Sequence, residues 1–148
     1  MPRLLKNSQG IGFLELILSL VVIVILLIFA TRYFTEARRH QQIEVATQQI
    51  HAIAQAYHNY YSANNHARPA SLMTLIENGY LAKGEDTNPW GGQNTVTRAT
   101  KPQYAHITFN GLPPNTADCN MLKKAVQNLT PQAMPAPTCV SGVLSGDF

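Results

Sequence analysis

The chain has 148 residues, of which 45% are hydrophobic and only 13% carry a formal charge. This length allows one ordinary domain, and the low charge argues against a highly charged disordered chain. The net charge is +3, but Arg3 and Lys6 lie at the extreme N-terminus, and without them nine Lys and Arg face eight Asp and Glu. The composition therefore gives no support for nucleic-acid binding.

The first long pattern is an apolar run from Ile11 to Thr31, in which Glu15 is the only charged residue. A helix of this length reaches about 31 Å, the thickness of the hydrocarbon layer of a bilayer. A secretory signal peptide or a plain signal anchor would also account for the basic start and the length. Neither gives a reason for Glu15, because a carboxylate inside a membrane costs on the order of 2.5–3.5 kcal/mol and usually has a partner.

Cleavage after Gly10 would supply that partner. Ile11 would then carry a new α-amine, and Glu15 would lie in the first turn of the helix, where free N–H groups favour negative charge. The carboxylate could pair with its own amine or with that of a neighbouring chain. Pairing between neighbours would select one axial stagger, because any other leaves a charge unpaired in an apolar bundle.

The residues Lys6–Gly10, then Ile11-Gly-Phe-Leu-Glu15, then the apolar run, resemble the class III leader of type IV pilins and type II secretion pseudopilins. The resemblance implies that a prepilin peptidase cleaves after Gly10 and N-methylates Ile11. Phe is the commonest residue after the cut, and Ile11 is more typical of the type IVb branch. Many pilins carry a proline near the end of this segment; here none lies between Pro2 and Pro69, which predicts a straighter helix.

The helical pattern continues as an apolar seam with spacings of three and four residues. It consists of Ile43, Ala46, Ile50, Ile53, Tyr57 and Tyr60. This seam predicts one helix from Ile11 to about Tyr61, whose second half is covered on one side by the domain that follows. A coiled coil is the alternative.

Beyond this helix the pattern is that of a small mixed domain. Four elements are expected: a short helix over 71–78, a hairpin of 93–99 and 103–110, a helix over 118–129, and a last strand over 140–143. Leu75–Leu81, followed by Asn88–Gly92, resembles the part of pilins and pseudopilins that leads into the sheet. Ile107–Cys119 resembles the type IVb pattern, in which a cysteine opens a helix after the sheet.

Cys119 and Cys139 are the only cysteines. An isolated pair in a small domain beyond a membrane segment predicts one disulfide and an oxidising compartment, with two unrelated buried thiols as the alternative. Because Arg32, Arg38 and Arg39 follow the apolar run, charge alone does not favour a cytoplasmic N-terminus. The cysteine pair and the leader decide for a periplasmic C-terminal domain.

These patterns predict an α+β fold, similar to that of pilins: a long N-terminal helix, half transmembrane and half amphipathic, packed on a small antiparallel β-sheet domain. The expected divisions are a leader peptide at 1–10, a transmembrane and polymerisation helix at 11–34, its amphipathic continuation at 35–66, and a globular α+β domain at 67–148 with a disulfide-closed C-terminal region.

The resemblance implies a structural subunit of a type IVb-like pilus. Such a chain sits in the lipid of the bacterial inner membrane as a single-pass protein, is processed by prepilin peptidase, and joins an assembly platform in that membrane. It then polymerises with itself and with other pilins into an extracellular filament for adhesion, motility or cell contact. A type II secretion pseudopilin and a non-polymerising membrane-anchored adaptor are the alternatives.

The sequence gives no reason to propose an enzyme, a cofactor or a metal. It contains no Ser/His/Asp set, paired-carboxylate site or phosphate loop. The five histidines include His51 and His58, whose spacing of seven is too long for a chelate on one helix turn. The acidic residues Glu85, Asp86 and Asp118 are scattered and do not form a calcium-binding run.

Overall fold

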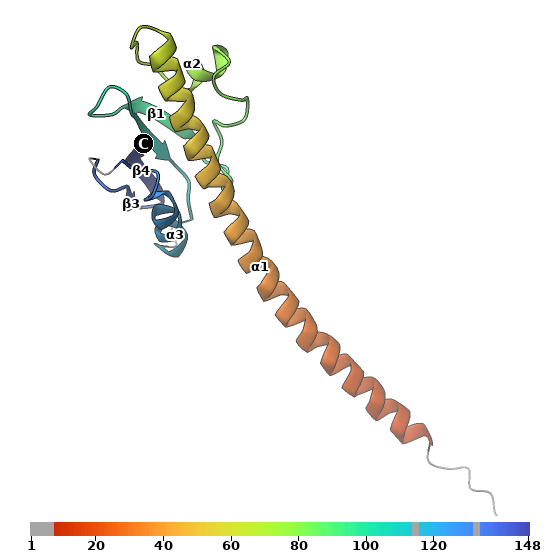
Figure 1. Cartoon of the computed structure of the whole chain (residues 1–148). Helices are drawn as coiled ribbons and strands as arrows, with labels where there is room; N and C mark the ends of the chain where they lie inside the picture. Colours follow the sequence, from red (N-terminus) through yellow and green to blue (C-terminus); the bar gives the residue numbers. More distant parts are fainter. Residues whose placement is uncertain (1–7, 114–115, 132–133) are drawn as a thin grey trace, which may run out of the picture. The chain divides into compact units, whose positions relative to one another are not determined.

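The computed structural model describes residues 8–113, 116–131 and 134–148. The predicted leader up to Asn7 lies outside these residues. In chain order the elements are α1 (Ser8–Ala63), α2 (Leu72–Glu77), β1 (Asn94–Arg98), β2 (Ala105–Phe109), α3 (Thr116–Val126), β3 (Thr138–Val140) and β4 (Val143–Asp147), labelled in Figure 1. The chain divides into two compact units, Met1–Arg38 and Arg39–Phe148; the second is called the head below.

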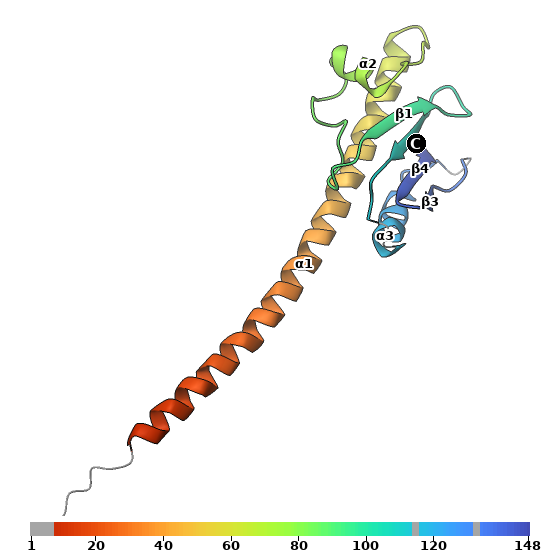
Figure 2. The same cartoon turned by 180° about the vertical axis from the view of Figure 1, so that it is seen from behind.

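The long helix predicted from the apolar run and the seam is present as α1, although it begins at Ser8 and not at Ile11. Its second half supplies one wall of the head's core. The seam residues Ile43, Ala46, Ile50, Ile53 and Tyr57 are buried, and this part of α1 lies along the sheet in Figures 1 and 2. The expected α+β fold is therefore observed, with the amphipathic half of the helix packed on an antiparallel sheet.

The sheet has four antiparallel strands in the order β1-β2-β4-β3. The predicted hairpin is confirmed by β1 and β2, in which Val96 pairs with Ile107. Alternation along β2 places Ala105, Ile107 and Phe109 in the core, since successive side chains of a strand point to opposite faces. This face of the sheet is the one that the helices cover.

The strand predicted over 140–143 is wrong. Val140 ends β3 and Val143 begins β4, and the two strands form a hairpin through Ser141 and Gly142. Both turn residues have positive φ, 51° and 74°, which is the backbone of a two-residue type I′ turn. The two valines therefore flank a turn, and the apolar pattern alone did not reveal the Ser-Gly turn between them.

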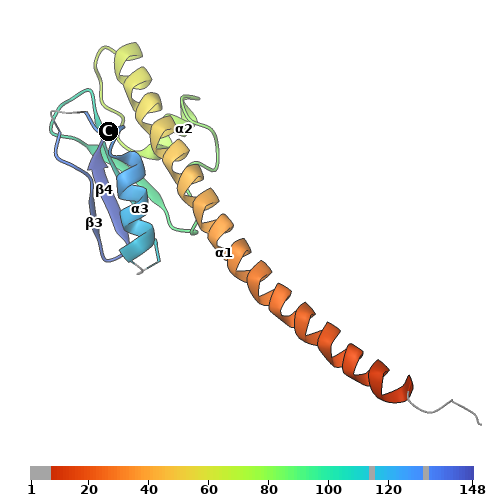
Figure 3. The ribbon, with the colours of Figure 1, turned by 60° about the horizontal axis from the view of Figure 1, so that its bottom comes forward.

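The two short helices form close to where they were expected. The Ser71 hydroxyl caps α2 by accepting from the Thr74 N–H, and Gly79 at φ +75° follows its end. The helix predicted over 118–129 is α3, which begins two residues earlier and ends at Val126. It lies beside β3 and β4 in Figure 3, with Leu122 and Val126 fully buried.

The Asn88–Gly92 loop has a specific geometry that explains its sequence. The Asn88 side-chain oxygen accepts from the N–H groups of Trp90 (3.1 Å) and Gly92 (3.0 Å), and its amide donates to the Asn110 carbonyl at 2.7 Å. A Cβ at Gly92 would come within 1.7 Å of that carbonyl oxygen, so the position requires glycine. Trp90 packs partly buried against the core.

Candidate functional site

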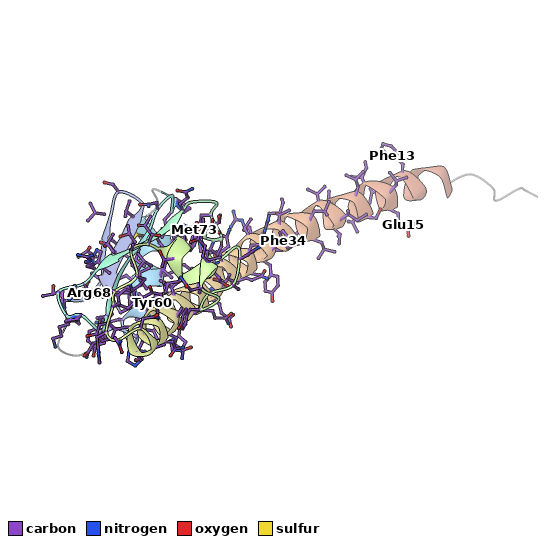
Figure 4. The ribbon with its side chains drawn as sticks, turned by 90° about the horizontal axis from the view of Figure 1, so that it is seen from above. Phe13, Glu15, Phe34, Tyr60, Arg68 and Met73 are labelled. Carbon is purple, nitrogen blue, oxygen red and sulfur yellow. A yellow bond between two sulfur atoms is a disulfide. The ribbon has the colours of Figure 1, made fainter. Side chains whose placement is uncertain are left out.

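The first half of α1 is apolar on every side. Its large hydrophobic side chains are exposed throughout, from 46% at Val24 to 80% at Tyr33, and those of Phe13 and Phe34 project from the helix in Figure 4. A helix that is hydrophobic all round needs an apolar environment. Within the described residues, α1 is the one helix long and apolar enough to cross a membrane.

Glu15 is exposed within this apolar segment and projects from the helix in Figure 4. No hydrogen bond or ion pair joins its carboxylate to another described residue. The hydroxyls of Ser19 and Thr31 satisfy themselves by donating to the carbonyls of Leu16 and Ile28, at 2.8 and 3.0 Å. A carboxylate is an acceptor only and cannot do the same, so in an apolar environment Glu15 would need a donor from outside the segment.

Gly10 and Ile11 lie within α1, but the Ile11 side chain falls outside the part of the chain that the structure describes. Cleavage between them and methylation of Ile11 therefore stay predictions. The same holds for the assembly role expected of Glu15.

The three arginines after the apolar run lie in different surroundings. The Arg38 guanidinium lies 5.7 Å from the centroid of the Phe34 ring, within the range of a cation–π contact. Arg39 belongs to the head, where its Nε lies 2.6 Å from Oδ1 of the buried Asp118. Arg32 and Arg38 are exposed, so these two and not Arg39 flank the apolar segment.

The Arg39–Asp118 ion pair was not predicted from the sequence. Asp118 lies in the first turn of α3, where the free N–H groups of the helix favour a carboxylate. Its place at a helix start was a readable signal, but nothing local indicated a partner so far away in the chain. The pair links the start of the head's part of α1 to the first turn of α3.

The predicted disulfide between Cys119 and Cys139 is confirmed. It joins α3 to the edge strand β3, with the two Cα atoms 5.9 Å apart. A disulfide persists in oxidising compartments. The bridge also closes the proline-rich connection that precedes β3, as the sequence indicated.

Two polar groups of the head were not anticipated. On neighbouring strands, His106 Nδ1 lies 2.6 Å from Asp147 Oδ1. The Tyr57 hydroxyl is buried and has no hydrogen-bond partner among the described residues. Burial raises the pKa of this phenol above its ordinary value of 10.0, against the opposing effect of the positive charges of Arg68 and Arg98.

The candidate functional site is therefore the apolar segment Gly12–Phe34 together with Glu15. Among the described residues, no group of three or more His, Cys, Asp and Glu is placed to hold a metal ion. Comparison of the chain with protein-family models, with curated proteins and with solved structures finds no significant match.

Proposed function

We propose that this chain is the precursor of a structural pilus subunit, similar to type IVb pilins. It is inserted in the inner membrane through Gly12–Phe34, cut after Gly10, methylated at Ile11, and polymerised into an extracellular filament. The observation that carries the proposal is the single carboxylate of Glu15 in a segment of α1 that is otherwise apolar on all sides. Such a helix can be buried by lipid before assembly and by copies of itself afterwards.

The position of Glu15 supports assembly over simple anchoring, because in a filament its carboxylate could pair with an α-amine. A plain anchor gains nothing from a carboxylate in the bilayer, which costs free energy there. A filament gains register, because a charge buried among apolar helices is tolerated where an opposite charge meets it. The non-polymerising adaptor therefore leaves the position of Glu15 without a reason.

The Cys119–Cys139 disulfide supports a periplasmic or extracellular head. It also favours a pilus subunit over a secretion pseudopilin, since many core pseudopilins lack a C-terminal cysteine pair. Pilins and pseudopilins share the same processing and the same N-terminal helix. The choice between them therefore concerns only the length of the filament and what it is used for.

The test is intact-mass spectrometry of membrane and sheared-filament material from cells that also produce a prepilin peptidase. The expected species begins at a methylated Ile11. Gly10→Ala should leave the leader attached, since the proposed peptidase subsite admits no side chain. Gly12→Ala is the matched control, because a Cβ at Gly12 meets no heavy atom within 4 Å, and it should be processed normally. A dominant species that retains the leader in the unmodified chain would refute the proposal.

A further inference from the structure

The head contains a hollow of about 560 Å³ on the flank of α1, called the α1 groove below. Sites for small molecules typically measure about 300–1,000 Å³. One wall is a single face of α1 that carries His51, Gln55, His58 and Asn59, at the spacing of helix neighbours. All of the residues that line the groove belong to the head.

The opposite wall comes from two connections that the backbone holds in place. Gln103 and Tyr104 lie in the link between β1 and β2, where the Tyr104 N–H donates to the Lys101 carbonyl. Asn128 and Leu129 follow α3, and the Leu129 N–H donates to the Val126 carbonyl at 2.9 Å.

The floor includes Phe148, which is 5% exposed. Its backbone exchanges two hydrogen bonds of 2.9 Å with Ala105. The groove is therefore built on fixed backbone and is present before a ligand arrives, which lowers the entropic cost of binding.

None of the described side chains that line the groove belongs to Asp, Glu, Lys or Arg. Two other hollows of the head differ in this respect: one is lined by Asp86, and the other by Arg98 and Asp147. A charged ligand would find no Asp, Glu, Lys or Arg side chain to pair with in the α1 groove. These side chains therefore favour a ligand without charge.

The polar groups of the lining are carboxamides, which both donate and accept hydrogen bonds. Gln55, Asn59, Gln103 and Asn128 line both walls, and none of their side chains hydrogen-bonds within the described part of the chain. By contrast, the Asn88 side-chain amide makes three hydrogen bonds inside the head and is not free for a ligand. The four free amides can each engage a hydroxyl group, or two adjacent ones, of a ligand.

Aromatic surface lies among these amides. Tyr104 contributes a partly exposed six-membered ring, and His51 and His58 contribute exposed imidazoles. Flat rings offer apolar area at low entropic cost, and the Tyr hydroxyl adds one more polar contact. Apolar ring faces bordered by uncharged amides match the two kinds of surface on a pyranose, its C–H face and its rim of hydroxyls.

We propose that the α1 groove binds an uncharged oligosaccharide. This activity goes beyond the proposed filament role and does not depend on polymerisation, because the groove is complete within one head. In a filament it would be repeated on every subunit that leaves the groove open, so that weak single sites would add up to avid attachment.

The test uses the full chain in a detergent without a sugar headgroup, such as a dodecyl amine oxide. The purified protein is first applied to an array of neutral, sialylated and sulfated oligosaccharides. The strongest neutral ligand is then titrated by calorimetry. Binding of neutral members, with weaker binding of their acidic counterparts, is expected. Absence of binding to every neutral oligosaccharide at up to about 10 mM would overturn the proposal, as would tighter binding of the acidic members.

Variants from the two walls locate the site. Asn59→Ala and Asn128→Ala should each weaken binding about five- to tenfold, the effect of losing one hydrogen-bonding amide. Gln48→Ala and Gln127→Ala remove exposed amides that do not line the groove and should bind as the unmodified chain does. Thermal unfolding midpoints of all four variants show whether each head is folded.

Tyr104→Phe keeps the ring and should retain most of the affinity, whereas Tyr104→Ala should lose it. Unchanged binding in both wall variants would place the ligand elsewhere and refute the proposal. So would wall variants that lower filament yield but leave oligosaccharide binding intact, because the groove would then be a contact between subunits. A failure of filament assembly in the unmodified chain would refute the filament role without affecting this test.

Discussion

Replacing Glu15 by alanine separates processing from assembly. Cleavage after Gly10 should proceed, because the proposed peptidase would read mainly the leader and Gly10. Insertion in the membrane should not suffer, since the substitution removes a carboxylate that costs on the order of 2.5–3.5 kcal/mol at a bilayer centre. The defect should appear only where subunits meet.

The size of that defect follows from the surroundings of Glu15. Its neighbours Phe13 and Leu16 are 69% and 60% exposed, so packing of α1 against its copies would desolvate this turn of the helix. The ammonium of Ile11 on an adjacent subunit would then be buried without its carboxylate. Breaking a buried ion pair on one side costs about 3–5 kcal/mol, which weakens subunit addition at least about 100-fold.

The assay compares the fraction of cleaved chain, from intact mass, with the yield of filaments after shearing. Glu15→Ala should give cleaved, membrane-resident and unpolymerised protein. Glu15→Gln keeps the shape and loses the charge, so it should rescue assembly poorly.

Ser19→Ala is the matched control, because Ser19 lies one turn further along α1 and its hydroxyl bonds within the helix, to the Leu16 carbonyl. It should polymerise normally. Normal filament yield from Glu15→Ala would refute the pairing mechanism, and loss of cleavage would refute the separation of the two steps.

Three further predictions concern the head. Cys139→Ser removes the disulfide to Cys119, which closes a loop with a sequence separation of 20, and should lower the free energy of unfolding by roughly 3 kcal/mol. The C-terminal region should then become sensitive to limited proteolysis, while cleavage of the leader is unchanged. Gly92→Ala drives a Cβ into the Asn110 carbonyl and should lower the free energy of unfolding in denaturant titrations by at least about 1–3 kcal/mol; an unchanged midpoint would contradict the loop geometry. Burial raises the pKa of Tyr57 above 10.0, so the folded head keeps its proton where the unfolded chain loses it, and stability should fall as pH rises above about 10. Tyr57→Phe should flatten that fall in stability curves measured from pH 8 to 11, and an equally steep fall in the variant would exclude Tyr57 as its source.

The parts of the fold that follow a local periodicity could be predicted from the sequence. The seam from Ile43 to Tyr60 and the alternation of Ala105, Ile107 and Phe109 each report which side chains face a core. The structure buries all of them except Tyr60, which is partly buried against the core. The disulfide was predictable for a different reason. The sequence has only two cysteines, and both lie in a small domain that follows an apolar segment, so each had one possible partner. These signals do not require knowledge of the tertiary arrangement.

The features that the sequence did not reveal depend on distant residues or on backbone angles. The Arg39–Asp118 ion pair and the His106–Asp147 contact join residues far apart in the chain. The hairpin between β3 and β4 turns on positive φ at Ser141, which a non-glycine residue adopts only occasionally. A pattern of apolar residues carries no information on either kind of feature.

The two halves of α1 thus differ in how their apolar side chains are distributed around the helix. From Phe13 to Phe34 the apolar side chains point in all directions and are exposed. A single substitution there should therefore alter how lipid or neighbouring subunits bury the helix, and it should leave the core of the head intact. From Ile43 to Tyr57 only one side is apolar and the head covers it. A charge placed at Ile50, which is fully buried, should therefore unfold the head, because a buried charge without a partner costs far more than the marginal stability of a small domain. The same charge placed at Leu20, on the apolar half, should leave the head folded and act on insertion and assembly. The location of the defect, and not only its size, distinguishes the two halves of the helix.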